Sequence, residues 1–403
     1  MRQGLYVVAL DRPWVETPFP FQGFVIDADR DLQTLQAYCG HVHVDPGWCD
    51  PEALAAAIHC AASGIVAERA AHDARQRLPS TRRFHELVAH ARAGRDQARR
   101  AVDRLMSDVR FGYSIDTRAA REAVTHLVGC VSADASAALW LTNLKNRDEY
   151  TSIHCVNVSV LALTYGLHCG LDHDSLVQLG TGALLHDVGK TLTPDEVLNK
   201  EGPLTAEEFE VMKRHPEDGY RLLRDGGGAS QGVLDIVRLH HERLHGRGYP
   251  FGLFGDQVPL TARICGVVDV YDAMTTDRSY REGLAADVAL KELFEHESEG
   301  LGTELVEDFI RCIGIFPVGS VVELDNGAVG IVVATNEEHR LQPTLLMLRT
   351  PDGEPYAKRL LVNLAVDAPT GEHDAAHRIA RAHNPADLGI DIRGIVAQEA
   401  QAG

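Results

Sequence analysis

The feature that most constrains this chain is a set of five histidines and two aspartates that lie within, or at the ends of, apolar segments. In chain order the set is His154, His186, Asp187, His215, His240, His241 and Asp269. Ile153 and Val156, for example, flank His154. Burying these groups without partners is costly. A hydrogen-bonded core histidine explains any one of them, but convergence on a metal centre explains all of them together.

The chemistry of this set narrows the choice of metal. It combines imidazoles and carboxylates without a thiolate, which favours iron, manganese or another borderline divalent ion over structural zinc. The set is too large for one ion but suits two divalent metal ions with one carboxylate bridging them. Two ions about 3.5–4 Å apart can activate a bridging water and stabilise the leaving oxygen of an in-line phosphoryl displacement. The residues therefore predict hydrolysis of a phosphate ester.

Cationic residues near this set are suited to phosphate. Lys190 stands one helical turn beyond Asp187, so both can face the same site. Arg278 and Arg281 follow the helix of Asp269 and can clamp phosphate oxygens, although ordinary surface residues are the alternative. The glycine-rich stretch 246–250 predicts an exposed loop at the mouth of the site.

The apolar patterns predict a mainly α protein, with a helical bundle between a small N-terminal α+β domain and a small β appendage. The domains expected are 1–115, which includes a linker helix, 116–315 for the bundle, 316–368 for the appendage and 369–403 for a loosely ordered tail. Strands are expected at Leu5–Leu10, Phe21–Ile26, His41–Val44, Ser320–Leu324, Val329–Ala334 and Thr344–Leu348. Helices are expected at Pro51–Ala70 and Phe84–Met106.

Charge and composition exclude several classes of protein. A net charge of -19 argues against a broad basic surface, and so against a nucleic-acid polymer as partner. The arginine-rich helix Phe84–Met106 is then read as a solvated face leading into the next domain rather than a nucleic-acid or membrane element. Cys155–Leu171 is uncharged but reads as a buried core helix, not a membrane span. Eight scattered cysteines and no visible secretory signal predict a cytoplasmic protein with reduced thiols.

The motifs, taken in order, resemble a known family. They are His186-Asp187-Val188-Gly189-Lys190, His215-Pro216-Glu217-Asp218-Gly219, His240-His241-Glu242-Arg243-Leu244-His245-Gly246-Arg247-Gly248-Tyr249-Pro250 and Asp269-Val270-Tyr271-Asp272-Ala273-Met274. This set is similar to the HD-GYP subgroup of the HD phosphohydrolase superfamily over about residues 120–315. The first segment, Gly4–Asp45, resembles an uncharacterised domain often found ahead of HD-GYP domains.

The resemblance implies hydrolysis of the bacterial second messenger cyclic di-GMP to the linear dinucleotide pGpG, and often onward to GMP. By the family pattern, one metal is held by His154, His186, Asp187 and Asp269. Asp187 bridges to a second metal held by His215, His240 and His241. Lys190, Arg278 and Arg281 match positions that contact the phosphates, and Lys190 also stabilises charge developing on the scissile phosphate.

The sequence departs from the family pattern at two positions. Some members hold a third metal with a Glu four residues before the first His, where this chain has Tyr150. Glu149 is out of helical register for that role, so we expect two metals. His245 replaces the usual Asp before the Gly-x-Gly-Tyr-Pro run, which leaves the loop geometry and its contacts open.

Three functions fit these residues. The first is an active cyclic di-GMP phosphodiesterase, and the second is a module that binds the messenger or a partner with little turnover. The third is a hydrolase of another substrate, such as a mixed cyclic dinucleotide. The Gly248-Tyr249-Pro250 loop either docks a GGDEF-type diguanylate cyclase or shapes the site entrance.

Overall fold

The computed structural model describes residues 5–10, 24–26, 32, 34–35, 39, 42–44, 49, 81–111, 113, 117–144, 150–200, 202–276, 283–336, 339–365 and 378–399. The chain divides into two compact units, Met1–Arg77 and Leu78–Gly403. In the first unit, β1 (Tyr6–Leu10) lies between β2 (Phe24–Val25) and β3 (Val42–Val44) in an antiparallel sheet. Leu5, Val7 and Ile26 are buried in its small core. The helix predicted at Pro51–Ala70 lies outside the described residues.

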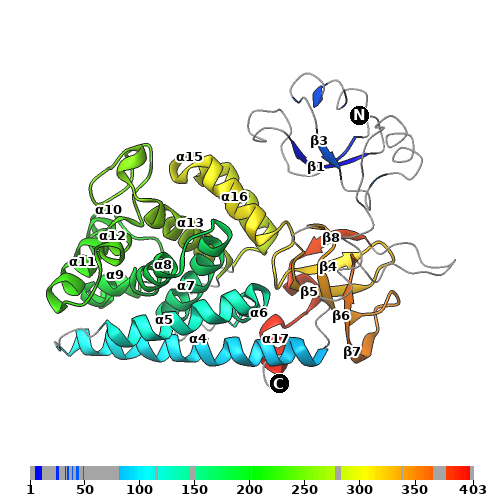
Figure 1. Ribbon diagram of the computed structural model, residues 1–403, viewed down its shortest axis with the longest axis horizontal. Coiled ribbons are helices and arrows are strands. Elements are labelled where there is room, and N and C mark those ends of the chain that lie inside the picture. The colour runs from blue at the N-terminus through cyan, green and yellow to red at the C-terminus, as the bar shows by residue number, and fades with distance from the viewer. Residues whose placement is uncertain are drawn as a thin grey trace. The chain divides into compact units, whose positions relative to one another are not determined.

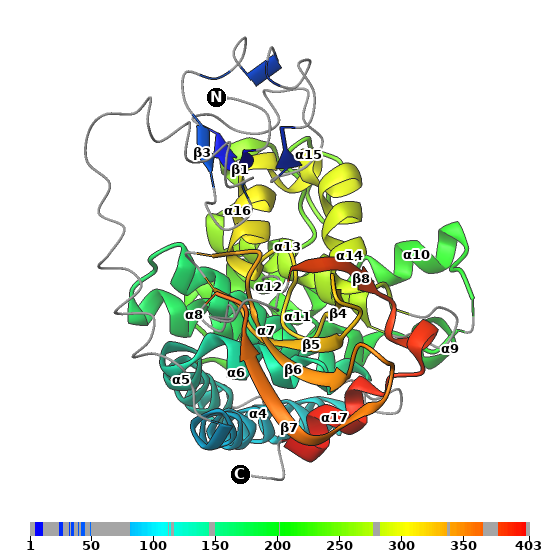
Figure 2. The same ribbon diagram turned by 90° about the vertical axis from the view of Figure 1, so that its right-hand side faces the viewer.

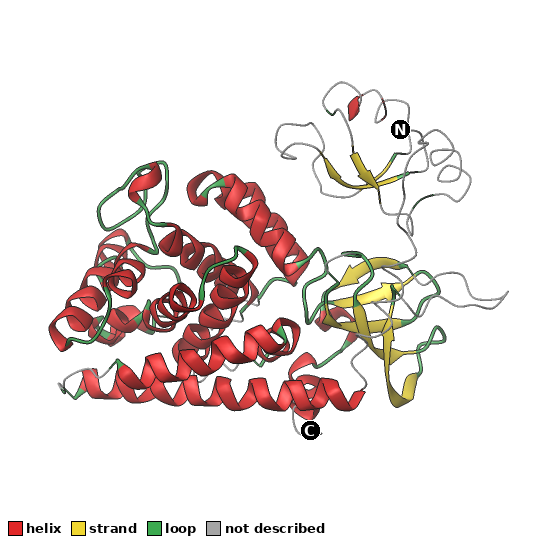
Figure 3. Ribbon diagram, in the orientation of Figure 1, coloured by secondary structure: helices red, strands yellow, loops and turns green. Residues whose placement is uncertain are grey.

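The second unit is a bundle of helices followed by a sheet (Figure 1, Figure 3). Its helices are α4 (Thr81–Arg110), α5 (Arg118–Ala133), α6 (Ala135–Thr142), α7 (Tyr150–His168), α8 (His173–Leu185), α9 (Asp195–Leu198), α10 (Ala206–Met212), α11 (His215–Gly226), α12 (Gln231–Leu239), α13 (Leu260–Thr275), α14 (Ala286–Glu292), α15 (Ser298–Leu301), α16 (Thr303–Ile313) and α17 (Ile392–Glu399). Short 3-10 turns occur at η3 (Val188–Leu192), η4 (Gly255–Gln257) and η6 (Pro385–Leu388), and a π-helical turn at η5 (Leu293–Glu297).

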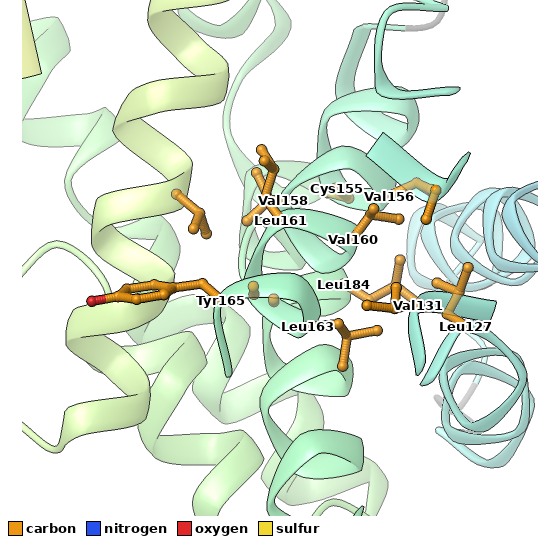
Figure 4. Packing of buried hydrophobic residues seen from close by; sticks show 14 of the residues in the cluster. Leu127, Val131, Cys155, Val156, Val158, Val160, Leu161, Leu163, Tyr165 and Leu184 are labelled. Carbon is orange, nitrogen blue, oxygen red and sulfur yellow. The ribbon is translucent and has the colours of Figure 1, made fainter. Parts of the chain in front are cut away.

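Helix α7 is apolar on all sides because it runs through the middle of the bundle. Figure 4 shows Val156 and Val160 pointing toward α5 and Tyr165 pointing to the opposite side. The ring of Tyr165 meets that of Phe309 at a centroid distance of 5.4 Å. A Cβ at Gly180 of α8 would lie 2.8 Å from a Leu163 methyl, so this glycine lets α7 and α8 approach closely. The segment Cys155–Leu171 is therefore a buried core helix, as predicted, up to residue 166.

The arginine-rich helix α4 belongs to the same core as the helices that follow it. Phe84, Val88 and Val102 are buried against α5, α6 and α7. Arg95 is only 8% exposed and donates from Nη2 to the carbonyl of Leu144 at 2.8 Å. The prediction of a fully solvated arginine face is therefore wrong at Arg95, because its guanidinium serves as a buried donor.

The C-terminal sheet is antiparallel in the order β7-β6-β5-β4-β8 (Figure 2). Its strands are β4 (Val321–Leu324), β5 (Val329–Ala334), β6 (Thr344–Arg349), β7 (Pro355–Asn363) and β8 (Ile379–His383). Ile331, Val333 and Leu346 join the core of the bundle. The predicted fold class, a mainly α protein with a helical bundle and small β elements, is confirmed.

The C-terminal tail is more ordered than the sequence predicts. Strand β8 pairs with β4, and α17 buries Val396 and Glu399. The carboxylate of Glu399 lies 2.8 Å from Nε2 of His85 on α4. The expectation of a loosely ordered tail over 369–403 is thus wrong for residues 378–399. An edge strand that buries Ile379 and leaves its neighbours exposed carries too few apolar residues to be recognised from sequence.

The described residues bear on the predictions about membrane spans and disulfides. No single helix among them is long and apolar enough to cross a membrane, and α5 and α6, which qualify only as a pair, are bent by 117°. No disulfide joins the seven cysteines that the structure describes.

Candidate metal centre

The five histidines and two aspartates come from separate helices and meet inside the bundle. His154 lies on α7, Asp269 lies on α13, and His215 is the first residue of α11. The two adjacent pairs, His186-Asp187 and His240-His241, directly follow the last residues of α8 and α12. The apolar runs before these pairs therefore form helices whose C-terminal ends lie next to each other, with the rings of His186 and His240 5.0 Å apart between centroids.

The seven side chains form two groups, and in each group the ligand atoms lie within 4.8 Å of one another. The first group is His154, His186 and Asp269, and the second is Asp187, His215, His240 and His241. Asp187 lies between the groups, since its Oδ2 is 3.3 Å from Nε2 of His186 and its Oδ1 is 3.3 Å from Nε2 of His215. This arrangement allows Asp187 to bridge an ion in the first group and an ion in the second.

Each group is compact and buried. In the first, Nε2 of His154 lies 3.1 Å from Oδ1 of Asp269. In the second, Nε2 of His215 lies 3.4 Å from Nε2 of His240. His186, Asp187, His215 and His240 are each at most 1% exposed, so water alone cannot solvate them well.

In three of the histidines, Nδ1, the ring nitrogen that points away from the centre, makes a hydrogen bond that fixes which nitrogen carries the proton. Nδ1 of His186 lies 2.7 Å from the carbonyl of Ala183, and that of His215 lies 2.7 Å from the carbonyl of Met212. His240 makes the same contact with the carbonyl of Val237 at 2.9 Å. Because a carbonyl can only accept, Nδ1 donates and Nε2 keeps its lone pair.

Asp272 plays the corresponding part for His154. Its Oδ2 lies 2.7 Å from Nδ1 of His154, and the carboxylate is 1% exposed. Asn157 and Thr276 also donate to it, each at 3.3 Å. Asp272 is a residue of the site that the sequence did not reveal, although it lies one helical turn after Asp269.

The ring nitrogens and carboxylate oxygens that point into the centre are hydrogen-bond acceptors, and their nearest neighbours are acceptors too. Nε2 of His186 and Oδ1 of Asp187 are buried and have no hydrogen-bond partner among the described residues. The short approach of His215 Nε2 to both Asp187 and His240 joins lone pairs, not a donor and an acceptor. Such orphaned lone pairs on imidazole and carboxylate groups fit divalent cations, which satisfy several of them at once.

The titration behaviour agrees with this reading. Burial acts to raise the pKa of Asp187, but the neighbouring His186 and the ammonium group of Lys190 outweigh it and hold the pKa well below its usual range. Burial, helped by Lys190, lowers the pKa of His215 to about 4. Burial likewise lowers the pKa values of His240 and His241. The second group is therefore a carboxylate with neutral imidazoles, the state in which these side chains bind metals.

His154 behaves differently. Burial acts to lower its pKa, but hydrogen bonds to Asp269 and Asp272 raise it to about 9. Without a cation, the ring holds a proton between the two carboxylates. A cation bound by His154 and Asp269 therefore displaces a proton.

Lys190 lies at the edge of the centre on η3. Its Nζ is 2.6 Å from Oδ2 of Asp187, and 24% of its side chain is exposed. It can thus reach a ligand that approaches from solvent. Arg278 and Arg281 lie outside the described residues, as does the side chain of Tyr150, and their roles stay predictions.

Glu242 organises the loop after the histidine pair. This residue is 4% exposed, and its carboxylate accepts from the backbone N–H groups of Phe251 and Leu253 at 2.7 and 2.9 Å. Nδ1 of His245 accepts from the N–H of Arg247 at 3.2 Å. His245 therefore bonds a loop amide, the task that the sequence assigned to the usual Asp. The sequence did not single out Glu242.

The loop closes over the second group through Tyr249. Its ring stacks on His241 with centroids 4.6 Å apart and an interplanar angle of 27°. Gly248 makes this path possible, because a Cβ there would lie 2.3 Å from the backbone nitrogen of Arg243. Gly189 is needed in the same way, since its Cβ would lie 2.0 Å from the carbonyl oxygen of His215.

Two family models match this sequence. One, described as HD domain, matches residues 135–304, a range that contains all seven residues of the centre. The other, a domain of unknown function (DUF3391), matches residues 1–120. The resemblance of the first segment to an uncharacterised domain is therefore confirmed.

Curated relatives share this sequence over different lengths. The cyclic di-GMP phosphodiesterase PA4108 of Pseudomonas aeruginosa is 35% identical over 354 residues, which cover 85% of this chain and 82% of that protein. The cyclic di-GMP phosphodiesterase response regulator RpfG of Xanthomonas campestris is 38% identical over 42% of this chain and 45% of its own. The 3'3'-cGAMP-specific phosphodiesterase 2 of Vibrio cholerae is 33% identical over 40% of this chain and 31% of its own.

Proposed function

Because the chain belongs to the HD-domain family of cyclic di-GMP phosphodiesterases, we propose that it hydrolyses cyclic di-GMP to linear pGpG, and pGpG onward to GMP. The observation that carries the proposal is the set of inward lone pairs at the centre. His186 Nε2 and Asp187 Oδ1 are buried acceptors without a donor. A protein keeps such atoms where a cation satisfies them.

The two groups support the proposed division of the residues between two metals. His154, His186 and Asp269 would hold one divalent ion, His215, His240 and His241 would hold the other, and Asp187 would contribute to both. Iron or manganese suits this thiolate-free set. Bound divalent ions supply electrostatic stabilisation for phosphoryl transfer and lower the pKa of a water nucleophile.

The protein's own side chains orient and charge the site. Lys190 places a partly exposed ammonium 2.6 Å from Asp187, where it can meet a phosphate oxygen and stabilise the charge that develops on it. Arg278 and Arg281 hold the other phosphate oxygens of the dinucleotide. Tyr249, stacked on His241, limits the access of water to the second group.

The test is hydrolysis by protein loaded anaerobically with Fe(II) or with Mn(II), with products separated by chromatography. Wild-type protein is expected to convert cyclic di-GMP to pGpG and GMP, and His186→Ala and Asp187→Ala should abolish turnover. His173→Ala, at the exposed start of α8, is the matched control. No turnover by wild-type protein that contains metal would refute the proposal, and tight binding without turnover would indicate the binding module instead.

A second substrate has support from the comparisons. A relative named as specific for 3'3'-cGAMP is 33% identical over 40% of this chain. The same assay is therefore run with cyclic di-GMP, 3'3'-cGAMP and cyclic di-AMP at equal concentrations. A kcat/KM at least tenfold higher for 3'3'-cGAMP than for cyclic di-GMP would reassign the substrate and leave the reaction type unchanged.

The Gly248-Tyr249-Pro250 loop has a role that can be tested separately. Its contact with His241 favours shaping of the site entrance over docking of a GGDEF-type cyclase. Tyr249→Ala is expected to lower hydrolysis, while Phe251→Ala, at a ring 50% exposed on the same loop, leaves it unchanged. Loss of binding to such a cyclase in both variants, with hydrolysis kept in Phe251→Ala, would instead support docking.

A further inference from the structure

A third group of metal-ligating side chains lies between α4 and α5 and shares no residue with the catalytic centre. His90 comes from α4, and His126 and Cys130 come from α5, one helical turn apart. One ligand atom from each lies within 4.8 Å of the others. Among the described residues it is the only such group that includes a thiol.

The three side chains already contact one another. The rings of His90 and His126 meet edge to face with centroids 5.4 Å apart. Sγ of Cys130 lies 3.7 Å from the backbone oxygen of His90, and Cys130 is only 2% exposed. His90 is exposed and His126 half-buried, so the group is open to solvent on one side.

Gly94 lets α4 approach α5 closely beside these side chains. It lies one turn after His90, and a Cβ there would come within 3.0 Å of Sγ of Cys130 and 3.8 Å of Nδ1 of His126. Glycine is unfavourable in the interior of a helix, and α4 spans 30 residues around this one. The glycine therefore avoids a side chain that would press on Cys130 and allows the ligands from α4 and α5 to lie close together.

A fourth residue on the same face of α4 supports the imidazole of His126. Oε1 of Gln97 lies 3.0 Å from Nδ1 of His126. When this amide oxygen accepts the ring proton, the other nitrogen keeps its lone pair. Partners of this kind orient histidine ligands in metal sites.

We propose that His90, His126 and Cys130 bind a zinc ion that links α4 to α5. Two imidazoles and a thiolate suit zinc, which accepts a water as its fourth ligand. Bonds of about 2.0–2.3 Å to zinc require the ligand atoms to draw closer by roughly 1 Å, which the exposed His90 side chain allows. Burial raises the pKa of the Cys130 thiol. Binding therefore releases the thiol proton to water, without any redox step.

Cobalt(II) distinguishes this site from the catalytic one. Cobalt replaces zinc, and a thiolate ligand gives it a charge-transfer absorption that nitrogen and oxygen ligands lack. The seven residues of the catalytic centre include no cysteine, so this absorption separates a thiolate site from that centre, and among the described residues the Cys130 group is the one candidate. The full chain is titrated with Co(II), and the absorption is then displaced with Zn(II).

Three variants make the test decisive. Cys130→Ser is expected to abolish the absorption, and His90→Ala, at an exposed position, to raise the Co(II) half-saturation concentration by about tenfold or more. Cys169→Ser, at an exposed cysteine after α7, serves as the control and keeps the absorption. Cyclic dinucleotide hydrolysis by His90→Ala should match that of wild-type protein.

Three results would each overturn the proposal. They are no charge-transfer absorption in wild-type protein, an absorption that persists in Cys130→Ser, and equal Co(II) affinity in His90→Ala and wild-type protein. Circular dichroism verifies the folding of each variant. Because His90 is exposed, its variant remains informative even where Cys130→Ser fails to fold.

Discussion

Asp272 is the residue whose role the structure defines most sharply, and Asp272→Asn tests it. The carboxylate receives Nδ1–H of His154 at 2.7 Å and amide and hydroxyl donors from Asn157 and Thr276 at 3.3 Å. The substituted amide has one oxygen for these donors, and its NH₂ group faces one of them. We therefore expect His154 to be held less firmly, by a neutral amide oxygen in place of a carboxylate.

Two general magnitudes give the expected size of the loss in metal affinity. Loss of a hydrogen bond to a charged group costs about 1.5–3 kcal/mol. Removing a partner of a metal-bound histidine typically lowers metal affinity by about 10–100-fold, which is about 1.4–2.8 kcal/mol. For Asp272→Asn we expect the lower end of this range, a loss of metal affinity of about tenfold. Asp272 also raises the pKa of His154, after burial and the hydrogen bond to Asp269, so its removal eases the loss of the ring proton that metal binding requires.

A rearrangement of Asn157 can compensate for only part of the lost hydrogen bonding in Asp272→Asn. Its Oδ1 is buried and has no partner among the described residues, so a flip of its amide would pair that oxygen with the new NH₂ group. The flip would give up the bond from Nδ2 of Asn157 to the carbonyl of Thr142 at 3.1 Å. One hydrogen bond is therefore lost in either arrangement.

The assay measures hydrolysis of cyclic di-GMP as a function of Mn(II), with metal content determined by atomic emission. Asp272→Asn should shift the half-saturating Mn(II) concentration upward by about tenfold, and kcat should recover within about threefold at saturating metal. Asp256→Asn, at an exposed position on η4, is the control. A shift smaller than twofold in folded protein would refute the reasoning.

Three further predictions concern other contacts of the centre. Lys190→Ala should lower kcat by about 10²–10³ with little change in metal content, and Lys190→Arg should restore part of it, measured by steady-state kinetics. Glu242→Gln leaves one oxygen for the amides of Phe251 and Leu253, so hydrogen exchange of loop 246–255 should accelerate while the helices stay protected. Chelation should lower the melting temperature of wild-type protein, since a site at 100 times its Kd adds about 2.7 kcal/mol, but should change that of Asp187→Ala less.

Most of the seven residues of the centre could be found from sequence because they are polar groups in, or at the end of, an apolar run, whereas His215 stands in a polar stretch and is recognised through the motif resemblance. Their partners could not be found in this way. Asp272 shares the face of Asp269, but helical spacing alone does not show that it accepts a hydrogen bond from His154 on another helix, and the carbonyls of Ala183 and Met212 leave no side-chain signal. Glu242 is hidden beside His241, since nothing local shows that it accepts from amides 9 and 11 residues later.

The fold likewise divides into elements that follow from local apolar patterns and elements that depend on partners far away in the sequence. The central helices, β4, β5 and β6 follow from apolar patterns within short windows. Strand β8 depends on pairing with β4, more than 50 residues earlier, and α17 buries Val396 in the main core and contacts His85 of α4 through Glu399. Propensity carries little information where distant partners provide most of the stabilisation.

The position of the centre at helix ends also has a physical reason. His186-Asp187 and His240-His241 directly follow α8 and α12, where unsatisfied carbonyls give the helix C-terminus a partial negative charge. Carbonyls three residues earlier accept Nδ1–H of His186 and His240, so the helix end itself directs each Nε2 inward. The same carbonyls add negative potential, which favours a cation. An apolar helix that ends in histidine thus supplies ligand, orientation and electrostatic attraction together, and the adjacent ends of α8 and α12 place His186, Asp187, His240 and His241 in one centre.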